Sequence, residues 1–140
     1  MPATRILAAL ATATALTACQ DAGERSVALL RPGDSFAVTR IDGNPAPQGG
    51  TFQVGGDGRV SGAAPCNRFS ARLAEQGGAM TLNGVVMTRR ACLDPARTMA
   101  ETRFAIALTS VTGARARSGQ VSLIDAEGRE RIGLAPVGGT

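Results

Sequence analysis

Three cysteines carry most of the chemistry that this 140-residue chain could perform. In an oxidising compartment two cysteines usually form a structural disulfide, whereas a reactive thiol needs a neighbouring base or a helix N-terminus. We predict a disulfide between Cys66 and Cys92. Two alternatives stay open: Cys92 stands two residues before Asp94, a predicted helix N-cap, so it could be a reactive thiol, or the pair could be packed free thiols.

The chain contains no histidine and no lysine. Serine or cysteine nucleophiles activated by histidine are therefore excluded, as is a serine with a lysine base. Two cysteines with scattered carboxylates do not form a structural tetrahedral metal site. The nearest carboxylate pair, Asp125 and Glu127, falls in a predicted turn, where acids commonly cap backbone N–H groups. We predict a non-catalytic protein with no metal and no cofactor.

The start of the chain has the pattern of an export signal. Residues 1–18 combine Arg5 with a short apolar run and small residues, as a secretory signal does. Leu16-Thr17-Ala18-Cys19 resembles the bacterial lipobox, which implies cleavage before Cys19 and acylation of Cys19. Gln20 follows instead of aspartate, so the chain resembles lipoproteins of the outer membrane that face the periplasm. The alternative is plain secretion, which leaves an odd thiol at Cys19.

The rest of the chain is long enough for one domain. Residues 19–34 are polar and irregular, and we predict a tether there, with a first strand around Ser26–Leu30 as the alternative. Residues 35–140 make up the predicted domain.

Alternating apolar and polar residues predict the strands. The expected strands are Ser35–Ile41, Thr51–Val54, Arg59–Gly62, Asn67–Ala74, Ala79–Leu82, Val85–Thr88, Ala114–Arg117, Val121–Ile124 and Arg131–Leu134. Hairpin-length links predict antiparallel pairing. Asn83-Gly84 is predicted to be a tight turn between two of these strands.

One helix is predicted over about 94–112. Asp94 is a good N-cap and Pro95 suits the first helical position. An apolar stripe at three- and four-residue spacing follows it: Ala100, Phe104, Ala107, Leu108 and Val111. Gly113 is expected to close the helix. One helix on an antiparallel sheet, or on a partly open small β-barrel, is an α+β fold.

The formal charge of +4 comes from 15 arginines spread along the chain. A nucleic-acid-binding domain usually shows a basic stripe or a recognisable module. Neither is visible, so we expect no nucleic acid among the partners.

These motifs together resemble the META domain found in HslJ-type, heat-inducible envelope lipoproteins. The resemblance is carried by Ile41-Asp42-Gly43, Arg59-Val60-Ser61-Gly62, Cys66-Asn67-Arg68-Phe69-Ser70, Thr88, Cys92, Glu101, Phe104, Leu108, Val121-Ser122-Leu123-Ile124-Asp125 and Gly128. It implies a small mixed domain with one helix and no established enzyme activity. It gives Asn67, Arg68, Phe69 and Thr88 a structural role. HslJ-like proteins are associated with envelope stress and novobiocin resistance.

We therefore expect a monomeric, lipid-anchored module that binds another envelope protein or supports the envelope under stress. The alternative is a carrier of a small apolar ligand, held in a pocket between sheet and helix.

Overall fold

The computed structural model of the chain describes residues 27–138. The predicted signal segment, residues 1–18, lies outside the described residues, as do Cys19 and the rest of the first half of the predicted tether, residues 19–26. The elements are η1 (Val27–Leu29), β1 (Ser35–Ile41), β2 (Asn44–Pro45), β3 (Thr51–Val54), β4 (Arg59–Ala63), β5 (Arg68–Gln76), β6 (Ala79–Met87), α1 (Pro95–Ser110), β7 (Gly113–Arg117), β8 (Gln120–Ile124) and β9 (Glu130–Pro136). Within residues 27–138, no helix is long and apolar enough to cross a membrane.

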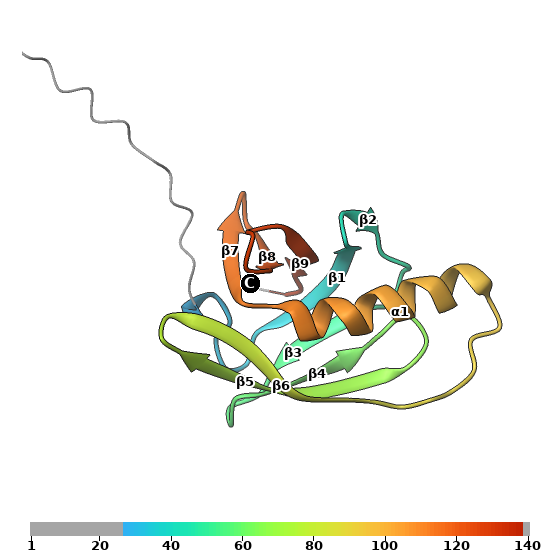
Figure 1. Cartoon of the computed structure of the whole chain (residues 1–140), viewed down its shortest axis with the longest axis horizontal. Coiled ribbons are helices and arrows are strands. Elements are labelled where there is room, and N and C mark those ends of the chain that lie inside the picture. The colour runs from blue at the N-terminus through green and yellow to red at the C-terminus, as the bar shows by residue number, and fades with distance from the viewer. Residues whose placement is uncertain (1–26, 139–140) are drawn as a thin grey trace, which may run out of the picture.

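The strands form one curled antiparallel sheet in the order β6-β5-β4-β3-β1-β9-β8-β7, with β2 paired to β1. The two ends of the sheet curl toward each other, and α1 lies across the open side (Figure 1). At one point the curl closes, because Met80 N–H donates to the Thr112 carbonyl at 3.0 Å. The predicted α+β fold with a partly open barrel is confirmed.

Strand β1 lies near the centre of the sheet, and its buried and more exposed side chains alternate as the sequence pattern predicted. Phe36 and Val38 are buried, and their neighbours point the other way. The strand ends at Asp42 and Gly43, whose φ angles are 49° and 73°. Two successive positive φ values in a two-residue loop are typical of the hairpin turns that match strand twist, so the chain turns back into β2.

The core lies between the sheet and α1. Three phenylalanine residues are almost fully buried there, with exposures of 0%, 3% and 0%: Phe52, Phe69 and Phe104. The Phe69 ring centroid is 5.8 Å from that of Phe52 and 5.2 Å from that of Phe104. Three of the four phenylalanines of the chain thus join the sheet to the helix, and burial of this apolar surface is the main force that holds the two layers together.

Helix α1 begins as the sequence predicted. The Asp94 carboxylate accepts the Ala96 N–H at 2.9 Å, and Pro95 occupies the first helical position. The end differs from the prediction, because Gly113 does not close the helix. The backbone is already extended at Val111, whose side chain is buried in the core, and Gly113 begins β7.

The predicted tight turn at Asn83-Gly84 is wrong, since both residues lie inside the continuous strand β6. The register against β5 shifts there: Arg72 pairs with Asn83, whereas Ser70 pairs with Val86. Gly84 has a φ of 60°, which lets one strand hold an extra residue as a bulge. Strand β5 is long enough to pair on both sides of that bulge, so the chain does not turn back.

The packed domain begins earlier than the sequence predicted. Leu30 is 3% exposed within the core, Gly33 N–H donates to the Val54 carbonyl at 2.8 Å, and Val54 N–H donates to the Asp34 carbonyl at 2.9 Å. Residues 27–34 of the predicted tether 19–34 therefore belong to the domain. The alternative of a strand at Ser26–Leu30 is not found either, because Val27–Leu29 form a 3₁₀ turn.

Candidate functional site

The corner between β4 and β5 gathers most of the residues that the sequence singled out. Cys66 and Cys92 form a disulfide with their Cα atoms 5.7 Å apart. The bond joins the turn before β5 to the segment that leads into α1. The predicted pairing is confirmed, and the two free-thiol alternatives do not describe this structure.

Asn67 follows Cys66 and is 7% exposed. Its Oδ1 accepts the Arg90 N–H at 2.6 Å and the Thr88 hydroxyl at 3.0 Å, while its Nδ2 donates to the Arg90 carbonyl at 3.1 Å. A buried amide that meets backbone donors and acceptors in this way stabilises a loop. Asn67 thus fixes the 88–90 segment to the same corner as the disulfide.

Thr88 and Arg68 complete this connection. Thr88 Oγ1 accepts the Arg68 N–H at 3.0 Å, and the Thr88 N–H donates to the Arg68 carbonyl at 3.0 Å. The next residue, Phe69, places its ring in the core. The corner is therefore held together by four of the residues that the sequence singled out: Asn67, Arg68, Phe69 and Thr88.

Two helix residues support the corner from the other side. Glu101 Oε2 accepts the Cys66 N–H at 2.9 Å. Arg97 donates to the Pro65 carbonyl at 2.7 Å and to the Gln48 carbonyl at 3.2 Å. No pattern in the sequence singles out Arg97. Its spacing of four residues from Glu101 places both on one side of the helix, but nothing in the sequence says that this side meets the Pro65 turn.

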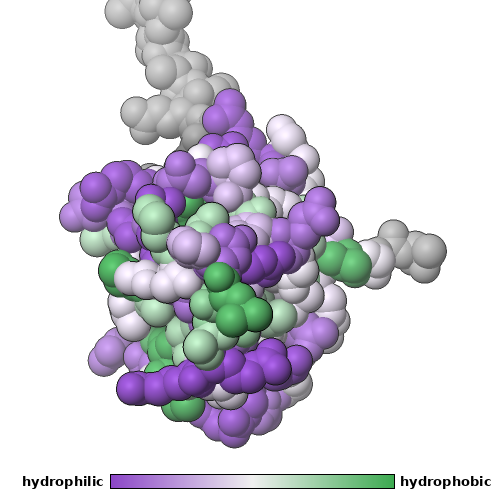
Figure 2. All heavy atoms as spheres, turned by 90° about the vertical axis from the view of Figure 1, so that its right-hand side faces the viewer, coloured by the Kyte–Doolittle hydropathy of each residue, from purple (hydrophilic) through white to green (hydrophobic). Residues whose placement is uncertain are grey.

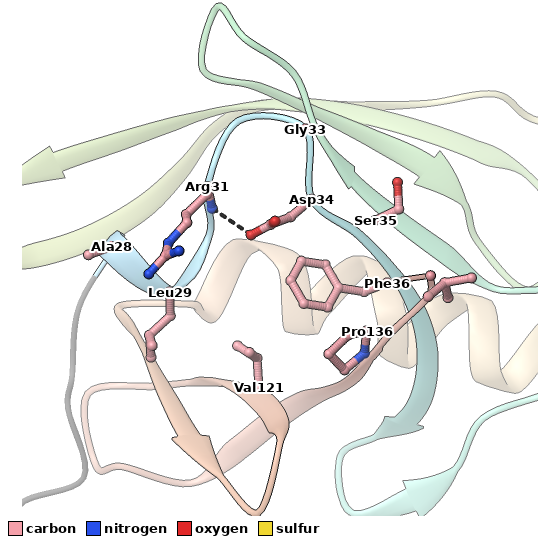
Figure 3. A pocket seen from close by; sticks show the side chains of 11 residues that line it. Ala28, Leu29, Arg31, Gly33, Asp34, Ser35, Phe36, Val121 and Pro136 are labelled. Atoms are coloured by element: carbon pink, nitrogen blue, oxygen red, sulfur yellow. Dashed lines mark hydrogen bonds between the residues drawn. The ribbon is translucent and has the colours of Figure 1, made fainter. Parts of the chain in front are cut away.

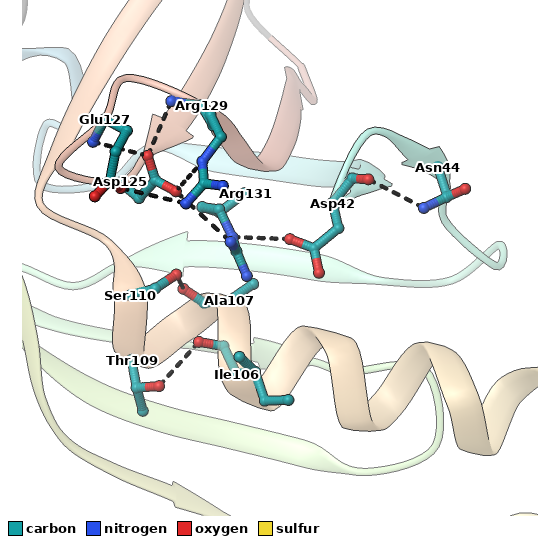
Figure 4. Close-up of polar contacts among 10 residues, drawn as sticks. All are labelled: Asp42, Asn44, Ile106, Ala107, Thr109, Ser110, Asp125, Glu127, Arg129 and Arg131. Carbon is teal, nitrogen blue, oxygen red and sulfur yellow. Dashed lines mark hydrogen bonds and ion pairs between the residues drawn. The ribbon is translucent and has the colours of Figure 1, made fainter.

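The predicted turn acid Asp125 lies in a charged cluster between β8 and β9 (Figure 4). Asp125 is 6% exposed, and its Oδ1 accepts the N–H groups of Glu127 at 3.1 Å and Arg129 at 2.9 Å. Its Oδ2 accepts Arg129 Nε at 2.9 Å. Asp125 and Glu127 therefore share a turn, where Asp125 caps backbone groups as expected.

Arg131 lies between two acids in the same cluster. Its Nε is 2.8 Å from Asp42 Oδ1 and its Nη1 is 3.6 Å from Asp125 Oδ2. Arg131 thus joins the β1–β2 turn to the β8–β9 turn (Figure 4).

The pKa of Asp125 is lowered from its ordinary value. Burial opposes this by raising the pKa, but the hydrogen bond from the Arg129 backbone, the charge of the Arg129 guanidinium and the bond from that guanidinium together outweigh it. The same pairing raises the pKa of Arg129. A carboxylate held in its ionised form is suited to a structural ion pair and not to proton transfer near neutral pH.

Four hollows described in the structure lie away from the space between sheet and helix. Four hollows of about 330 to 670 Å³ are formed by residues 27–138, and none of these four is lined by a residue of α1. The space beneath the helix is filled by the phenylalanine rings. The apolar-ligand pocket expected for a carrier therefore finds no support.

One hollow of about 370 Å³ lies where the start and the end of the described chain meet (Figure 3). Phe36, Val121 and Pro136 form its apolar side. Asp34 accepts the Arg31 N–H at 2.8 Å at its rim, so the carboxylate serves its own turn. Within residues 27–138, no three metal-ligating side chains lie together.

Comparisons with known proteins agree with this fold. The family model described as META domain matches residues 27–135. An NMR structure of a protein from Burkholderia xenovorans is 22% identical, covers 98% of this chain and 99% of that chain, and has a TM-score of 0.61. A second NMR structure is 23% identical, covers 73% and 87% of the two chains, and has a TM-score of 0.54. No curated protein matches the chain. At these identities the solved structures support the fold alone.

Proposed function

Since the chain belongs to the META domain family, we propose that it is a non-catalytic, lipid-anchored domain of the cell envelope, of the HslJ-like type. It binds another envelope protein or supports the envelope under stress. Cys19 carries the lipid and places the domain on the outer membrane, facing the periplasm.

The observation that carries this proposal is the use of the motif residues by the fold itself. The amide of Asn67 is occupied by the Arg90 backbone and Thr88. Asp125 is occupied by a turn and by Arg129. Glu101 faces the Cys66 amide. An enzyme needs an acid, base or nucleophile that can reach a substrate. Each side chain named here already has a structural partner, Glu101 through its Oε2 alone.

The lipid anchor is tested by mass spectrometry of the mature protein from envelopes. We expect a chain that begins at Cys19 and carries added acyl mass. A Cys19→Ser variant is expected to lose that mass. A mature chain that begins elsewhere, or an unmodified Cys19, overturns the anchor.

The stress function is tested by deleting the gene and restoring it. Wild-type protein is expected to restore growth under heat or in novobiocin, and the Cys19→Ser variant is not, at equal abundance. An affinity purification after cross-linking should recover the same envelope protein repeatedly. Unchanged growth of the deletion strain together with no reproducible partner contradicts the proposal.

A further inference from the structure

Helix α1 carries apolar side chains on its solvent face as well as on its core face. Met99 and Ile106 are 56% and 54% exposed, and Leu93, just before the helix, is 100% exposed. Met99 and Ile106 are seven residues apart, which places them on one side of a helix. A surface helix normally turns charged residues to solvent, so this exposed apolar side needs an explanation.

The exposed residues of α1 include one charged side chain, Arg103. The full set is Pro95, Ala96, Thr98, Met99, Thr102, Arg103, Ile106 and Thr109. The segment before the helix adds exposed Arg89 and Arg90. We call Arg89, Arg90, Leu93, Met99, Arg103 and Ile106 the α1 outer face.

The positive charge of the α1 outer face is not compensated. The side chains of Arg89, Arg90 and Arg103 form no hydrogen bond or ion pair within residues 27–138. The acids nearest in sequence are turned to backbone amides: Asp94 accepts the Ala96 N–H and Glu101 accepts the Cys66 N–H. A negatively charged partner of this face would therefore find three guanidinium groups free to pair with it.

This unpaired positive charge disfavours a second copy of the chain. In a two-fold interface the same surface meets itself. Arg103, between Met99 and Ile106, would then approach the Arg103 of the other copy, with no acid on either face to pair with them. A negatively charged lipid surface has no such repulsion and accepts both the apolar and the basic side chains.

The position of the chain start fits a membrane beside this helix. Segment η1 packs against β7, which follows α1 directly, and Val27 lines one hollow together with Thr112 and Gly113, so the described chain starts near the C-terminal end of the helix. The chain from Cys19 to Val27 can extend at most about 29 Å. The helix of 16 residues is about 24 Å long. An anchor at Cys19 can therefore reach a bilayer that lies along the helix.

Figure 2 looks onto the side of the molecule where the segment before α1 and the start of the helix lie. Hydrophobic atoms gather in the middle of this side, and strongly hydrophilic atoms border them. This arrangement is typical of surfaces that enter the interface of an anionic membrane, with apolar side chains inserted and basic side chains among the headgroups.

We propose that the α1 outer face docks on a bilayer containing anionic phospholipid. The proposal rests on the proposed lipid anchor, which holds the domain near that surface. Leu93 enters the interface first, because it is fully exposed, and Arg89, Arg90 and Arg103 contact the phosphates. Docking lays the helix along the membrane and turns the outer face of β5 and β6 away from it.

The chain has no tryptophan and no tyrosine, so one introduced tryptophan reports without background. The acylated Leu93→Trp protein is reconstituted in phosphatidylcholine vesicles with and without phosphatidylglycerol. With phosphatidylglycerol we expect emission at shorter wavelength and quenching by brominated lipid. The docking equilibrium constant from this quenching is expected to fall about fivefold for each of Arg89→Gln, Arg90→Gln and Arg103→Gln.

The matched control is Val86→Trp. Val86 is 64% exposed and pairs with Ser70, on the sheet face opposite to the buried Phe69. The fluorescence of Val86→Trp is expected to stay unquenched in vesicles with and without phosphatidylglycerol. Arg72→Gln, on the same outer face of β5, is expected to leave docking unchanged. Equal quenching of both tryptophans, or of neither, overturns the proposal.

The two proposals fail separately. A protein that is acylated and vesicle-bound, but whose Leu93→Trp emission does not respond to phosphatidylglycerol, refutes the docking face alone. If the chain proves unacylated, the lipid anchor fails. The emission of Leu93→Trp on addition of phosphatidylglycerol vesicles then still decides whether the α1 outer face binds. We expect Arg103→Gln to reduce this response and Arg72→Gln to leave it unchanged.

Discussion

The side-chain amide of Asn67 pairs with the backbone of Arg90 at two points, accepting its N–H at 2.6 Å and donating to its carbonyl at 3.1 Å. The neighbouring residue, Cys66, is joined covalently to Cys92. Two adjacent residues of one turn thus hold the segment that leads into α1, one by hydrogen bonds and one by a disulfide. The entry of the helix is therefore held by contacts other than those of its core face.

Asn67→Ala is expected to lower the free energy of unfolding by about 2–3 kcal/mol, because three hydrogen bonds are lost at a buried residue. Urea unfolding, with the transition midpoint as the readout, measures this change. Thr88→Val removes only the hydroxyl, which lies at a more exposed position, and is expected to cost about 1 kcal/mol. Equal stability of Asn67→Ala and wild type contradicts the role given to the amide.

Removal of the disulfide by Cys66→Ala with Cys92→Ala is expected to lower the free energy of unfolding by about 3–4 kcal/mol, because the unfolded chain gains freedom when the closed loop opens. The Asn67 bonds are expected to keep the segment in place, so the Arg90 amide should stay protected in hydrogen exchange. Wild-type protein in reductant serves as the control and should match the double variant. A rapidly exchanging Arg90 amide would show that the disulfide alone holds the segment.

The sequence predicted the elements whose signals are local. Strand β1 was predicted with its observed bounds because burial alternates along it, and α1 because Asp94 and Pro95 mark its start. The α+β fold followed from this order of elements. Where a local signal had two meanings, the prediction failed: Asn83-Gly84 can form a turn or a bulge, and only the length of the partner strand β5 decides between them.

The candidate site was predictable in its covalent part and less so in its polar part. Cysteine number and compartment indicated the Cys66–Cys92 pair. The contacts of Arg97 with the Pro65 and Gln48 carbonyls depend on where the helix lies on the sheet, which no short-range pattern contains. The burial of Leu30 was not predictable for the same reason, because it depends on how residues 27–34 pack against the curled sheet.

Gly62→Ala is expected to destabilise the domain by about 3 kcal/mol or more. A Cβ at Gly62 would overlap the Thr51 carbonyl oxygen and lie 3.0 Å from the Phe69 ring. The backbone of β3 and a core ring would both have to move. Thermal and urea unfolding measure the change.

Gly56→Ala is the matched control for this substitution. Nothing lies within 4 Å of a Cβ at Gly56, and its φ is not positive. A small gain of about 0.5 kcal/mol is expected, because alanine restricts the unfolded chain more than glycine does. If the two variants unfold alike, the close approach of β3 and β4 at Gly62 is not as described.

The ion pair of Asp125 makes stability depend on pH in a defined direction. The folded pKa of Asp125 is lowered from the ordinary 3.8, so the folded state binds this proton less readily than the unfolded state does. The contribution of Asp125 is therefore full above about pH 4 and is lost as the pH falls from there through the folded pKa. Asp125→Asn removes the charge and should be less stable than wild type at neutral pH.

Urea unfolding of wild type and Asp125→Asn across a pH series measures this difference. The gap in free energy of unfolding between the two proteins is expected to narrow as the pH falls below about 4. Asp57→Asn is the comparison, because the pKa of Asp57 is also lowered, chiefly by the hydrogen bond from the Arg59 N–H. The Asp57 side chain is 61% exposed, so solvent screens its charge. At neutral pH, Asp57→Asn should therefore lower the free energy of unfolding by less than Asp125→Asn does. A gap for Asp125→Asn that is constant with pH would show that the carboxylate gains nothing from its charge, and that the bonds to the Glu127 and Arg129 amides alone hold the turn.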